Sequence, residues 1–423
     1  MLELSYLREH KDEAIKRLSK RKLQAQTAVE DILRLDEQRR SNQAELDAVL
    51  AESNSLSKEI GQLFKEGKAQ EANTLKDKTA SLKEKSKELQ QEQEQIRHAL
   101  ENLLVTLPNT PHELVKEGAD AHDNEEIKVV GQKPGLAEGA KPHWELADQY
   151  GLIDFELGVK ITGAGFPVYK GKGARLQRAL INFFLEQNIE AGYEEYQPPH
   201  FVNEASGFGT GQLPDKEGQM YHMEKDNLYA IPTAEVPITN LFRDVIIDHE
   251  DLPIRCTAYT PCFRREAGSY GKDVRGLNRL HQFDKVEVVT VSKPEASYGI
   301  LEEMVAHVGG LLEKLGLHYR ILRLCGGDMG FTSAMTYDFE VWSAAQERWL
   351  EVSSVSNFET YQSNRLKLRY RGEDRKTQLC HTLNGSALAL PRVLAALLEN
   401  NQSAEGIRIP DVLIPYTGFE IIA

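Results

Sequence analysis

Apolar residues recur at alternating steps of three and four along residues 30 to 105. The first series is Ile32, Leu35, Arg39, Asn42, Leu46, Val49, Ser53, Leu56, Ile60 and Leu63. The second series is Leu75, Thr79, Leu82, Ser86, Leu89, Gln93, Ile96, Leu100 and Leu103. A period of 3.5 residues sustained over several heptads predicts a coiled coil. Because a short turn at Glu66–Ala69 lies between the two series, an antiparallel helical hairpin is the simplest arrangement.

The predicted hairpin is long, since a helix of about 35 residues spans roughly 50 Å. Two uses of such an arm stay open, an oligomerisation coil and a surface that grips a partner. Polar residues at Arg39, Asn42 and Gln93 weaken the apolar seam without excluding either use.

The rest of the chain has a different pattern. Two prolines within Leu107–His112 end the helical region, and a polar stretch follows as far as Gly139. Gly173–Gln187 has the apolar spacing of an amphipathic helix and leads to a strand that closes on Pro199. Beyond Tyr229, short strands such as Tyr337–Trp342 mix with a few helices.

Strands and helices without regular βαβ alternation predict an α+β domain, an antiparallel sheet flanked by helices. We therefore expect an N-terminal helical domain over residues 1–110 with its arm at about 30–105, a linker over 111–140, and a sheet domain over 141–423.

Length and charge are consistent with two domains, since 423 residues exceed what one core usually supports. The net charge of -14 argues against an obvious nucleic-acid binder, because phosphate contacts need lysine and arginine. The balance is uneven: residues 1–110 hold 19 Lys and Arg against 20 Asp and Glu, and the remainder holds 32 against 45. If RNA binds, the N-terminal part repels it least.

No apolar run approaches the roughly 18 residues that a membrane span needs, and acidic residues come too early for a signal peptide. We therefore expect a cytoplasmic protein that does not enter a membrane. The four cysteines show no Cys-x-x-Cys pairing and are expected to be mostly buried thiols. They are Cys256, Cys262, Cys325 and Cys380.

The segment Thr260–Glu287 carries the richest candidate chemistry. It predicts two strands joined by a Gly-rich basic loop, with Arg264 and Glu266 on one strand face. Phe283 and Glu287 also share a face and stand roughly 13 Å apart, enough for a base at one end and a small polar group at the other. The alternative is an ordinary charged surface hairpin. Because the chain lacks a Gly-x-Gly-x-x-Gly or Walker loop, any ATP must be bound by another kind of site.

Three more segments agree with a nucleotide site, namely Ile231–Pro237, Glu351–Ser354 and Asn384–Arg392. Together with the hairpin, and in the same order, they resemble the bacterial-type seryl-tRNA synthetases, which are class II aminoacyl-tRNA synthetases. The resemblance runs essentially end to end. It implies ATP and Mg²⁺, serine as a substrate, and an arm that grips tRNA(Ser), with tRNA(Sec) also used where present. It also implies a homodimer assembled through residues 173–199.

In such an enzyme the serine carboxylate attacks the α-phosphorus of ATP, so catalysis is positioning plus charge neutralisation. Arginine forks and a hard divalent cation suit that task. The resemblance implies that Arg264 bridges the serine carboxylate and the α-phosphate, while Glu266 accepts from the adenine amino group. It also implies that Phe283 and Arg392 cover the two faces of the adenine and that Arg279 holds the outer phosphates.

The full residue sets implied by the resemblance are as follows. The catalytic residues are Arg264, Arg279 and Arg392. The serine contacts are Thr233, Ala234, Glu235, Arg264, Glu287, Asn384 and Ser386. The ATP contacts are Arg264, Arg265, Glu266, Arg279, Leu280, Phe283, Glu351, Val352, Ser353, Ser354 and Arg392, and the metal ligands are Glu351 and Ser354.

Several of these residues have simpler explanations. Phe283 alternates with valines and fits a core strand, and Thr233 fits an ordinary helix cap. Glu351 and Ser354 stand three apart, so a regular strand would place them on opposite faces unless a bulge lies between them. The chain also departs from the usual family sequence at Arg265, where a small residue is common, and at Pro391, where glycine is common.

Two other functions remain open. One is a class II ligase for a different small amino acid, and the other is a coiled-coil interaction protein with a decayed catalytic domain. The paired acids Glu235 and Glu287 favour serine, because glycine or alanine would leave their hydrogen-bond capacity unused. The intact set of arginines and acids argues against decay.

Overall fold

The computed structural model describes residues 1–215, 218–266 and 275–423. The loop at 267–274, the Gly-rich part of the predicted hairpin, lies outside the described residues. The chain divides into two compact units. One unit consists of Leu2–Ser19 and Leu23–Pro108, and the other of Met1, Lys20–Lys22 and Asn109–Ala423.

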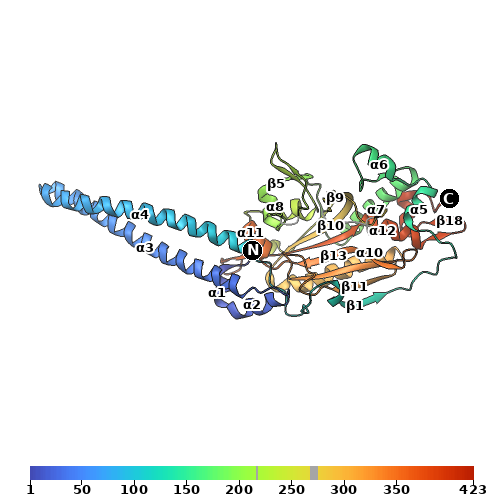
Figure 1. Cartoon of the computed structure of the whole chain (residues 1–423), viewed down its shortest axis with the longest axis horizontal. Coiled ribbons are helices and arrows are strands. Elements are labelled where there is room, and N and C mark those ends of the chain that lie inside the picture. The colour runs from blue at the N-terminus through green and yellow to red at the C-terminus, as the bar shows by residue number, and fades with distance from the viewer. Residues whose placement is uncertain (216–217, 267–274) are drawn as a thin grey trace. The chain divides into compact units, whose positions relative to one another are not determined.

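The smaller unit is entirely helical. Its helices are α1 (Leu4–Glu9), α2 (Lys11–Ser19), α3 (Gln26–Lys65) and α4 (Ala69–Leu104). Helices α3 and α4 run side by side as a long hairpin (Figure 1), with the turn where the heptad pattern predicts it. The buried seam residues include Leu46, Val49 and Leu89. The coiled-coil hairpin is confirmed.

Next to the predicted seam residue Leu35, the structure buries a charge. Asp36 is fully buried and accepts hydrogen bonds from Arg8 of α1 (2.8 Å), Arg39 (2.8 Å) and Arg40 (3.2 Å). Leu35 is only half-buried. A cluster of charges therefore joins α1 to α3, where the heptad pattern alone predicts an apolar layer.

The larger unit is built on an eight-stranded sheet with the order β1-β11-β12-β13-β16-β10-β9-β4. Neighbouring strands are antiparallel, except that β4 is parallel to β9. The strands are β1 (Glu125–Val130), β4 (Glu194–Glu195), β9 (Ile254–Phe263), β10 (Gln282–Ser292), β11 (Tyr319–Arg323), β12 (Met335–Ser343), β13 (Arg348–Asn357) and β16 (His381–Ala389).

The two faces of the sheet are distinct, because side chains alternate along a strand. Val286 and Val288 of β10 join the main core. Helices α7 (Gly171–Glu190), α10 (Ser297–Lys314) and α12 (Leu390–Asn400) also contribute to that core. Val289 instead packs with Ala234 and Ile238 at α9 (Glu235–Asn240). The face that carries α9 also carries Glu287, so the predicted serine contacts of β10 and α9 lie on the same side of the sheet.

The larger unit also contains short helices and small sheets, several of which are labelled in Figure 1. The short helices are α5 (His143–Gln149), α6 (Phe155–Ile161), α8 (Glu204–Thr210), α11 (Tyr361–Leu366) and α13 (Ile414–Thr417). The small sheets are β2 (Ile153–Asp154) with β3 (Val168–Tyr169); β5 (Phe201–Asn203), β7 (Leu228–Ala230) and β6 (His222–Met223); β15 (Thr377–Leu379), β14 (Arg369–Arg371) and β8 (Ile246–Asp248); and β17 (Gln402–Ser403), β18 (Gly406–Arg408) and β19 (Ile421–Ile422).

The predicted α+β class is confirmed. All four cysteines are buried free thiols, as expected. Within the described ranges, no helix is long and apolar enough to span a bilayer.

Candidate active site

The β9–β10 hairpin positions the first group of predicted residues. Past the end of β9, the Arg264 amide donates to the carbonyl of His281 (2.9 Å), which keeps the two chains paired. The Arg264 guanidinium lies over the Phe283 ring, 5.2 Å from its centroid. Its Nε donates to the carbonyl of Pro232 (3.4 Å). Phe283 packs at the edge of the core but stays half-exposed, so it differs from a fully buried core residue.

Glu266 and Arg279 flank residues 267–274 and form an ion pair, with 2.9 Å between Oε2 and Nη1. Glu266 adopts a positive φ of 48°, an uncommon conformation for a residue with a side chain. The structure therefore brings together the acid predicted to read adenine and the arginine predicted to hold phosphate. The Arg265 guanidinium instead lies over the ring of Tyr221, at 5.6 Å.

Glu287 lies at the centre of a buried polar cluster and is 1% exposed. Asn384 Nδ2 donates to its Oε1 (2.7 Å), and the ammonium of Lys285 stands 2.7 Å from its Oε2. Ser386 is its cross-strand neighbour on β16 and is also buried. Lys285 precedes Glu287 by two residues, which places both side chains on one face of β10.

Glu235 begins α9 and is the second buried acid. Gln362 Nε2 donates to its Oε1 (2.6 Å), and the Thr382 hydroxyl donates to Gln362 Oε1 (2.7 Å), which fixes the orientation of the amide. Burial raises the pKa of Glu235 to about 7, and the negative charge of Glu287 adds to that shift. Arg264 and Lys285 oppose the shift, so the two acids and these cations act on one another. We call Glu235, Glu287, Lys285, Asn384 and Gln362 the acidic cluster.

Thr233 and Ala234 precede α9. The Thr233 hydroxyl accepts from the Glu235 amide (3.2 Å), so Thr233 does bond the start of the helix as an ordinary cap would. It is 5% exposed. The Ala234 methyl packs in the apolar group behind α9, so only its backbone is available to a ligand.

A bulge brings Glu351 and Ser354 together on β13. Phe339 pairs with Ser353 while the next residue, Glu340, pairs with Glu351, so Val352 is an extra residue in β13. Ser354 Oγ stands 3.4 Å from Glu351 Oε1, as an irregular strand allows and a regular one would not. The resemblance required a bulge or a strand end between these two residues, and the structure has a bulge there.

The extra residue itself points inward. The side chains of Val352 and Leu280 belong to the main core, so these two predicted ATP contacts have only backbone to offer. The Ser353 hydroxyl donates to the carbonyl of Ser386 (2.6 Å) and ties β13 to β16.

Arg392 lies in the first turn of α12, with Pro391 beside it as its sequence predicts. Its Nε donates to the carbonyl of Asn278 (2.9 Å), and its Nη1 donates to the carbonyl of Glu351 (2.8 Å). The guanidinium is therefore held between β13 and the segment of the β9–β10 hairpin that contains Asn278. It remains 27% exposed, so a ligand can still contact it.

The comparisons with known proteins decide the family. The model of the tRNA synthetase class II core domain (G, H, P, S and T) matches residues 220–401, and that of the seryl-tRNA synthetase N-terminal domain matches residues 1–111. A serine–tRNA ligase of Salinibacter ruber is 55% identical over 393 residues, 92% of each chain. The chain belongs to the seryl-tRNA synthetase family. This is a family of ligases that charge tRNA(Ser) with serine, so the chain is placed among enzymes.

Further relatives agree along the whole length. A serine–tRNA ligase of Akkermansia muciniphila is 49% identical, covering 100% of this chain and 99% of its own. The crystal structure of a seryl-tRNA synthetase from Pyrococcus horikoshii complexed with ATP matches with a TM-score of 0.94 at 34% identity, covering 100% of this chain and 99% of that one. The cytoplasmic serine–tRNA ligase of Naegleria fowleri in complex with AMP matches with a TM-score of 0.89 at 27% identity, covering 100% and 98%.

Sequence reasoning missed three side chains of this seryl-tRNA synthetase fold, namely Lys285, Gln362 and Asp338. The sequence could have shown Lys285, because it lies two residues from both Phe283 and Glu287 and so shares a strand face with them. Gln362 lies on α11, distant in sequence from Glu235, and no spacing rule connects them.

Asp338 of β12 is the cross-strand neighbour of Ser354. Burial, followed by the charge of Glu351, raises its pKa well above the ordinary value. Its Oδ1 is buried and has no hydrogen-bond partner within the described part of the chain. Two carboxylates that repel one another beside a serine hydroxyl are the kind of donor set that a hard cation occupies.

Proposed function

We propose that the chain activates serine with ATP, forming seryl-adenylate, and then transfers the serine to the 3′ end of tRNA(Ser). The observation that carries this proposal is the acidic cluster, in which Glu235 and Glu287 are buried close to Arg264. Serine presents an ammonium group, a hydroxyl and a carboxylate. Two buried acids and one arginine complement those three groups.

In the proposed first step, the ammonium and hydroxyl of serine bind the acids while the carboxylate faces Arg264. The pKa of about 7 means that Glu235 loses its proton when the ammonium binds, because a nearby positive charge favours the ionised form. A carboxylate oxygen of serine then attacks the α-phosphorus of ATP, and the bond to pyrophosphate breaks. Arg264 offsets the charge that builds up on the reacting groups.

We assign the adenine to the half-exposed ring of Phe283, with the guanidinium of Arg392 on its other face. The Glu266 carboxylate accepts from the adenine amino group. Arg279 exchanges its bond with Glu266 for the outer phosphates of ATP. The mutual ion pair keeps both side chains in place before the nucleotide arrives.

Glu351 and Ser354, with Asp338 behind them, fit the Mg²⁺ that this reaction uses. No described group of three or more His, Cys, Asp or Glu side chains could hold a metal ion by itself. Mg²⁺ usually takes one or two carboxylates and fills its other positions with phosphate oxygens and water. When bound, the ion offsets phosphate charge and orients the leaving pyrophosphate.

The remaining assignments follow the family. The α3–α4 hairpin grips tRNA(Ser), and tRNA(Sec) where present, and the chain works as a cytoplasmic homodimer assembled through residues 173–199. The N-terminal domain is taken as 1–110, the linker as 111–140 and the catalytic domain as 141–423.

The test is ATP–pyrophosphate exchange with each of the twenty amino acids in turn, with Mg²⁺ present. Serine should support exchange, and alanine and glycine should be rejected by a factor of about 10⁴, because they would leave buried acceptors unpaired. Glu287→Ala should abolish exchange while ATP binding persists. Equal exchange with alanine would point to a ligase for another amino acid, and no exchange with any amino acid would point to a decayed site.

A further inference from the structure

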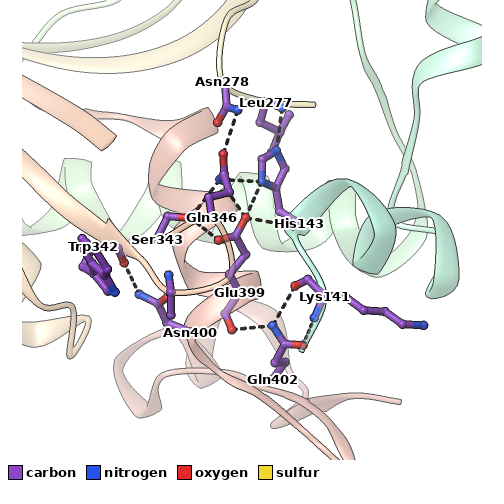
Figure 2. Close-up of polar contacts among 11 residues, drawn as sticks. Lys141, His143, Leu277, Asn278, Trp342, Ser343, Gln346, Glu399, Asn400 and Gln402 are labelled. Atoms are coloured by element: carbon purple, nitrogen blue, oxygen red, sulfur yellow. Dashed lines mark hydrogen bonds and ion pairs between the residues drawn. The ribbon is translucent and has the colours of Figure 1, made fainter. Parts of the chain in front are cut away.

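A second buried polar network lies at the other end of α12, away from the acidic cluster. Figure 2 shows His143, the first residue of α5, directed at Glu399 in the last turn of α12. His143 Nδ1 stands 2.7 Å from Glu399 Oε1, and both side chains are 0% exposed. The His143 amide also donates to that oxygen (3.0 Å).

The other ring nitrogen settles the direction of the proton. The backbone amide of Leu277 donates to His143 Nε2 (2.9 Å), so Nε2 acts as an acceptor and Nδ1 carries the hydrogen given to Glu399. The imidazole thus connects a helix carboxylate to a loop amide. Nδ1 also has Gln346 Nε2 at 3.4 Å, and Nε2 accepts from Leu277 (Figure 2).

Glu399 is a saturated acceptor. The Ser343 hydroxyl donates to Oε2, and Gln346 Nε2 donates to Oε1 (2.9 Å). Burial acts to raise the pKa of Glu399, but the hydrogen bonds from His143 and Ser343 outweigh it and the pKa is lowered. An ionised carboxylate with all these donors has little capacity left for a ligand. Its role is therefore to hold its neighbours.

The neighbours that it holds belong to the limb of the hairpin that returns toward β10. Besides Leu277, the side chain of Asn278 donates to Gln346 Oε1 (3.1 Å). Gly276 has a φ of 65°, and a Cβ added there would stand 2.3 Å from His143 Nε2. The imidazole and this limb are therefore packed so closely that position 276 admits only glycine.

This limb carries one arginine of the proposed nucleotide site and binds the other. Arg279 follows Asn278 directly, and Arg392 donates to the Asn278 carbonyl (2.9 Å). Arg392 and Glu399 stand seven residues apart on α12, close to two turns, and so lie near one face. Helix α12 thus binds residues 276–279 at two points. Arg392 bonds to them directly, and Glu399 acts on them through His143.

We infer that the His143–Glu399 pair is a positioning unit for ATP, which holds residues 276–279 so that Arg279 and Arg392 converge on the nucleotide. The inference rests on the proposed function for the roles of the two arginines. His143 and Glu399 touch neither substrate and act through Leu277 and Asn278. Their loss should weaken ATP binding and leave the acidic cluster unaffected.

Two substitutions of His143 separate its two bonds. In His143→Asn the side-chain amide can replace Nδ1 and still donate to Glu399, but nothing reaches Leu277. In His143→Gln the longer side chain can replace Nε2 and accept from Leu277. We expect the KM for ATP in serine-dependent pyrophosphate exchange to rise about tenfold in His143→Asn, as the loss of one buried hydrogen bond implies, and about twofold or less in His143→Gln. The KM for serine should stay within about twofold in both.

The matched control is Asn400→Ala. Asn400 follows Glu399 in the chain. Its side chain donates to the carbonyl of Trp342 and accepts from the amide of Ala344, and these bonds do not involve residues 276–279. It should lower the melting temperature without changing the KM for ATP. A purely structural role would instead give both His143 variants the same KM for ATP as the wild type, and that result would overturn the inference. An equal rise in the KM for serine would overturn it too.

Two further measurements keep the test decisive. If the His143 variants do not fold, Gly276→Ala perturbs the same contact from the limb, and an unchanged KM for ATP in that variant would overturn the inference. Calorimetric titration of ATP without serine measures nucleotide affinity directly. A wild-type chain that binds ATP but exchanges no amino acid would contradict the proposed function, while the ATP affinities of the variants would still decide the role of His143.

Discussion

Glu235 and Glu287 belong to one acidic cluster but have different partners. Glu287 is paired with the ammonium of Lys285, whereas Glu235 accepts from the neutral amide of Gln362. The pKa of Glu235 is accordingly raised to about 7 from an ordinary value of 4.5. Glu235 is thus the acid whose charge changes near neutral pH.

This difference predicts a pH-dependent stability. Between pH 4.5 and 7, Glu235 is protonated in the folded chain and ionised in the unfolded chain. The folded state therefore binds more protons, and the free energy of unfolding falls as pH rises through that window. Glu235→Gln removes the effect. We expect the variant to be more stable than wild type at pH 8, by on the order of 2–3 kcal/mol, and similar at pH 5. Denaturant unfolding at both pH values measures this, with the exposed Glu224→Gln as a control that should show no difference. A variant less stable than wild type at pH 8 would contradict the raised pKa.

A second residue-scale prediction concerns nucleotide choice. Glu266→Gln keeps the size of the side chain but brings donors to the adenine amino group, which is itself a donor. It also weakens the ion pair with Arg279. We expect the preference for ATP over GTP in pyrophosphate exchange to fall by about tenfold, the equivalent of one hydrogen bond. If the preference does not change, the base does not bind at Glu266.

At the scale of the element, single irregularities decide what a strand or helix presents. One extra residue in β13 places Glu351 and Ser354 on one face, since a bulge resets the alternation of side chains. In the helical hairpin, the buried Asp36 replaces an apolar layer and binds α1 to α3 through Arg8. Neither feature changes the type of element.

Asp36→Asn tests the charged layer. Burial acts to raise the pKa of Asp36, but hydrogen bonds from Arg8 and Arg39 lower it below 3.8, so the ionised form stabilises the helices above that pH and the stabilisation is lost as pH falls. At pH 7 the variant should lose roughly 2 kcal/mol, less than a wholly buried pair because the arginines are partly exposed.

Hydrogen exchange of the α1 amides measures this loss, and the difference from wild type should shrink below about pH 4. The control is Asp31→Asn, which breaks the exposed pair with Arg34 and should change exchange little. Unchanged α1 exchange in Asp36→Asn at pH 7 would show that the cluster does not hold the helix.

At the scale of the whole molecule, the two units allow serine activation to be tested separately from the charging of tRNA. The hairpin can be shortened at a defined level, because Gln93 donates to Gln43 (2.9 Å) and Asn42 to Glu92 (3.0 Å) across the seam. Replacing residues 46–89 with a short Gly-rich turn preserves these pairs and the Asp36 layer.

If the proposed homodimer forms through residues 173–199 and the arm serves tRNA, the shortened chain should exchange pyrophosphate at the wild-type rate and stay dimeric, yet charge tRNA about tenfold less efficiently or worse. Near the tip, Lys76 lies over Phe64 and Lys78 pairs with Glu52, and both lysines are exposed and are candidate phosphate contacts. Wild-type charging should weaken as salt rises, because contacts with phosphate release counterions. Normal charging by the shortened chain would leave the arm a structural feature, and a monomer would make it the dimerisation element.

The sequence by itself determined the elements whose period is strong and the residues whose types are unusual. The heptads predicted the α3–α4 hairpin. The arginines and acids of the β9–β10 hairpin, and of the segments near Glu351 and Arg392, predicted the site through their resemblance to a known family. For β13, the sequence showed only that Glu351 and Ser354 need a bulge or a strand end between them to share a face, and the structure has a bulge at Val352.

Only the tertiary structure decided which side chains meet. Lys285 neutralises Glu287, Gln362 fixes Glu235, and His143 links Glu399 to Leu277. The second and third pairs join segments that are distant in sequence, whereas Lys285 and Glu287 stand two residues apart on one face of β10. A periodic pattern states which face a residue occupies, but the register and packing of the sheet determine what lies opposite it.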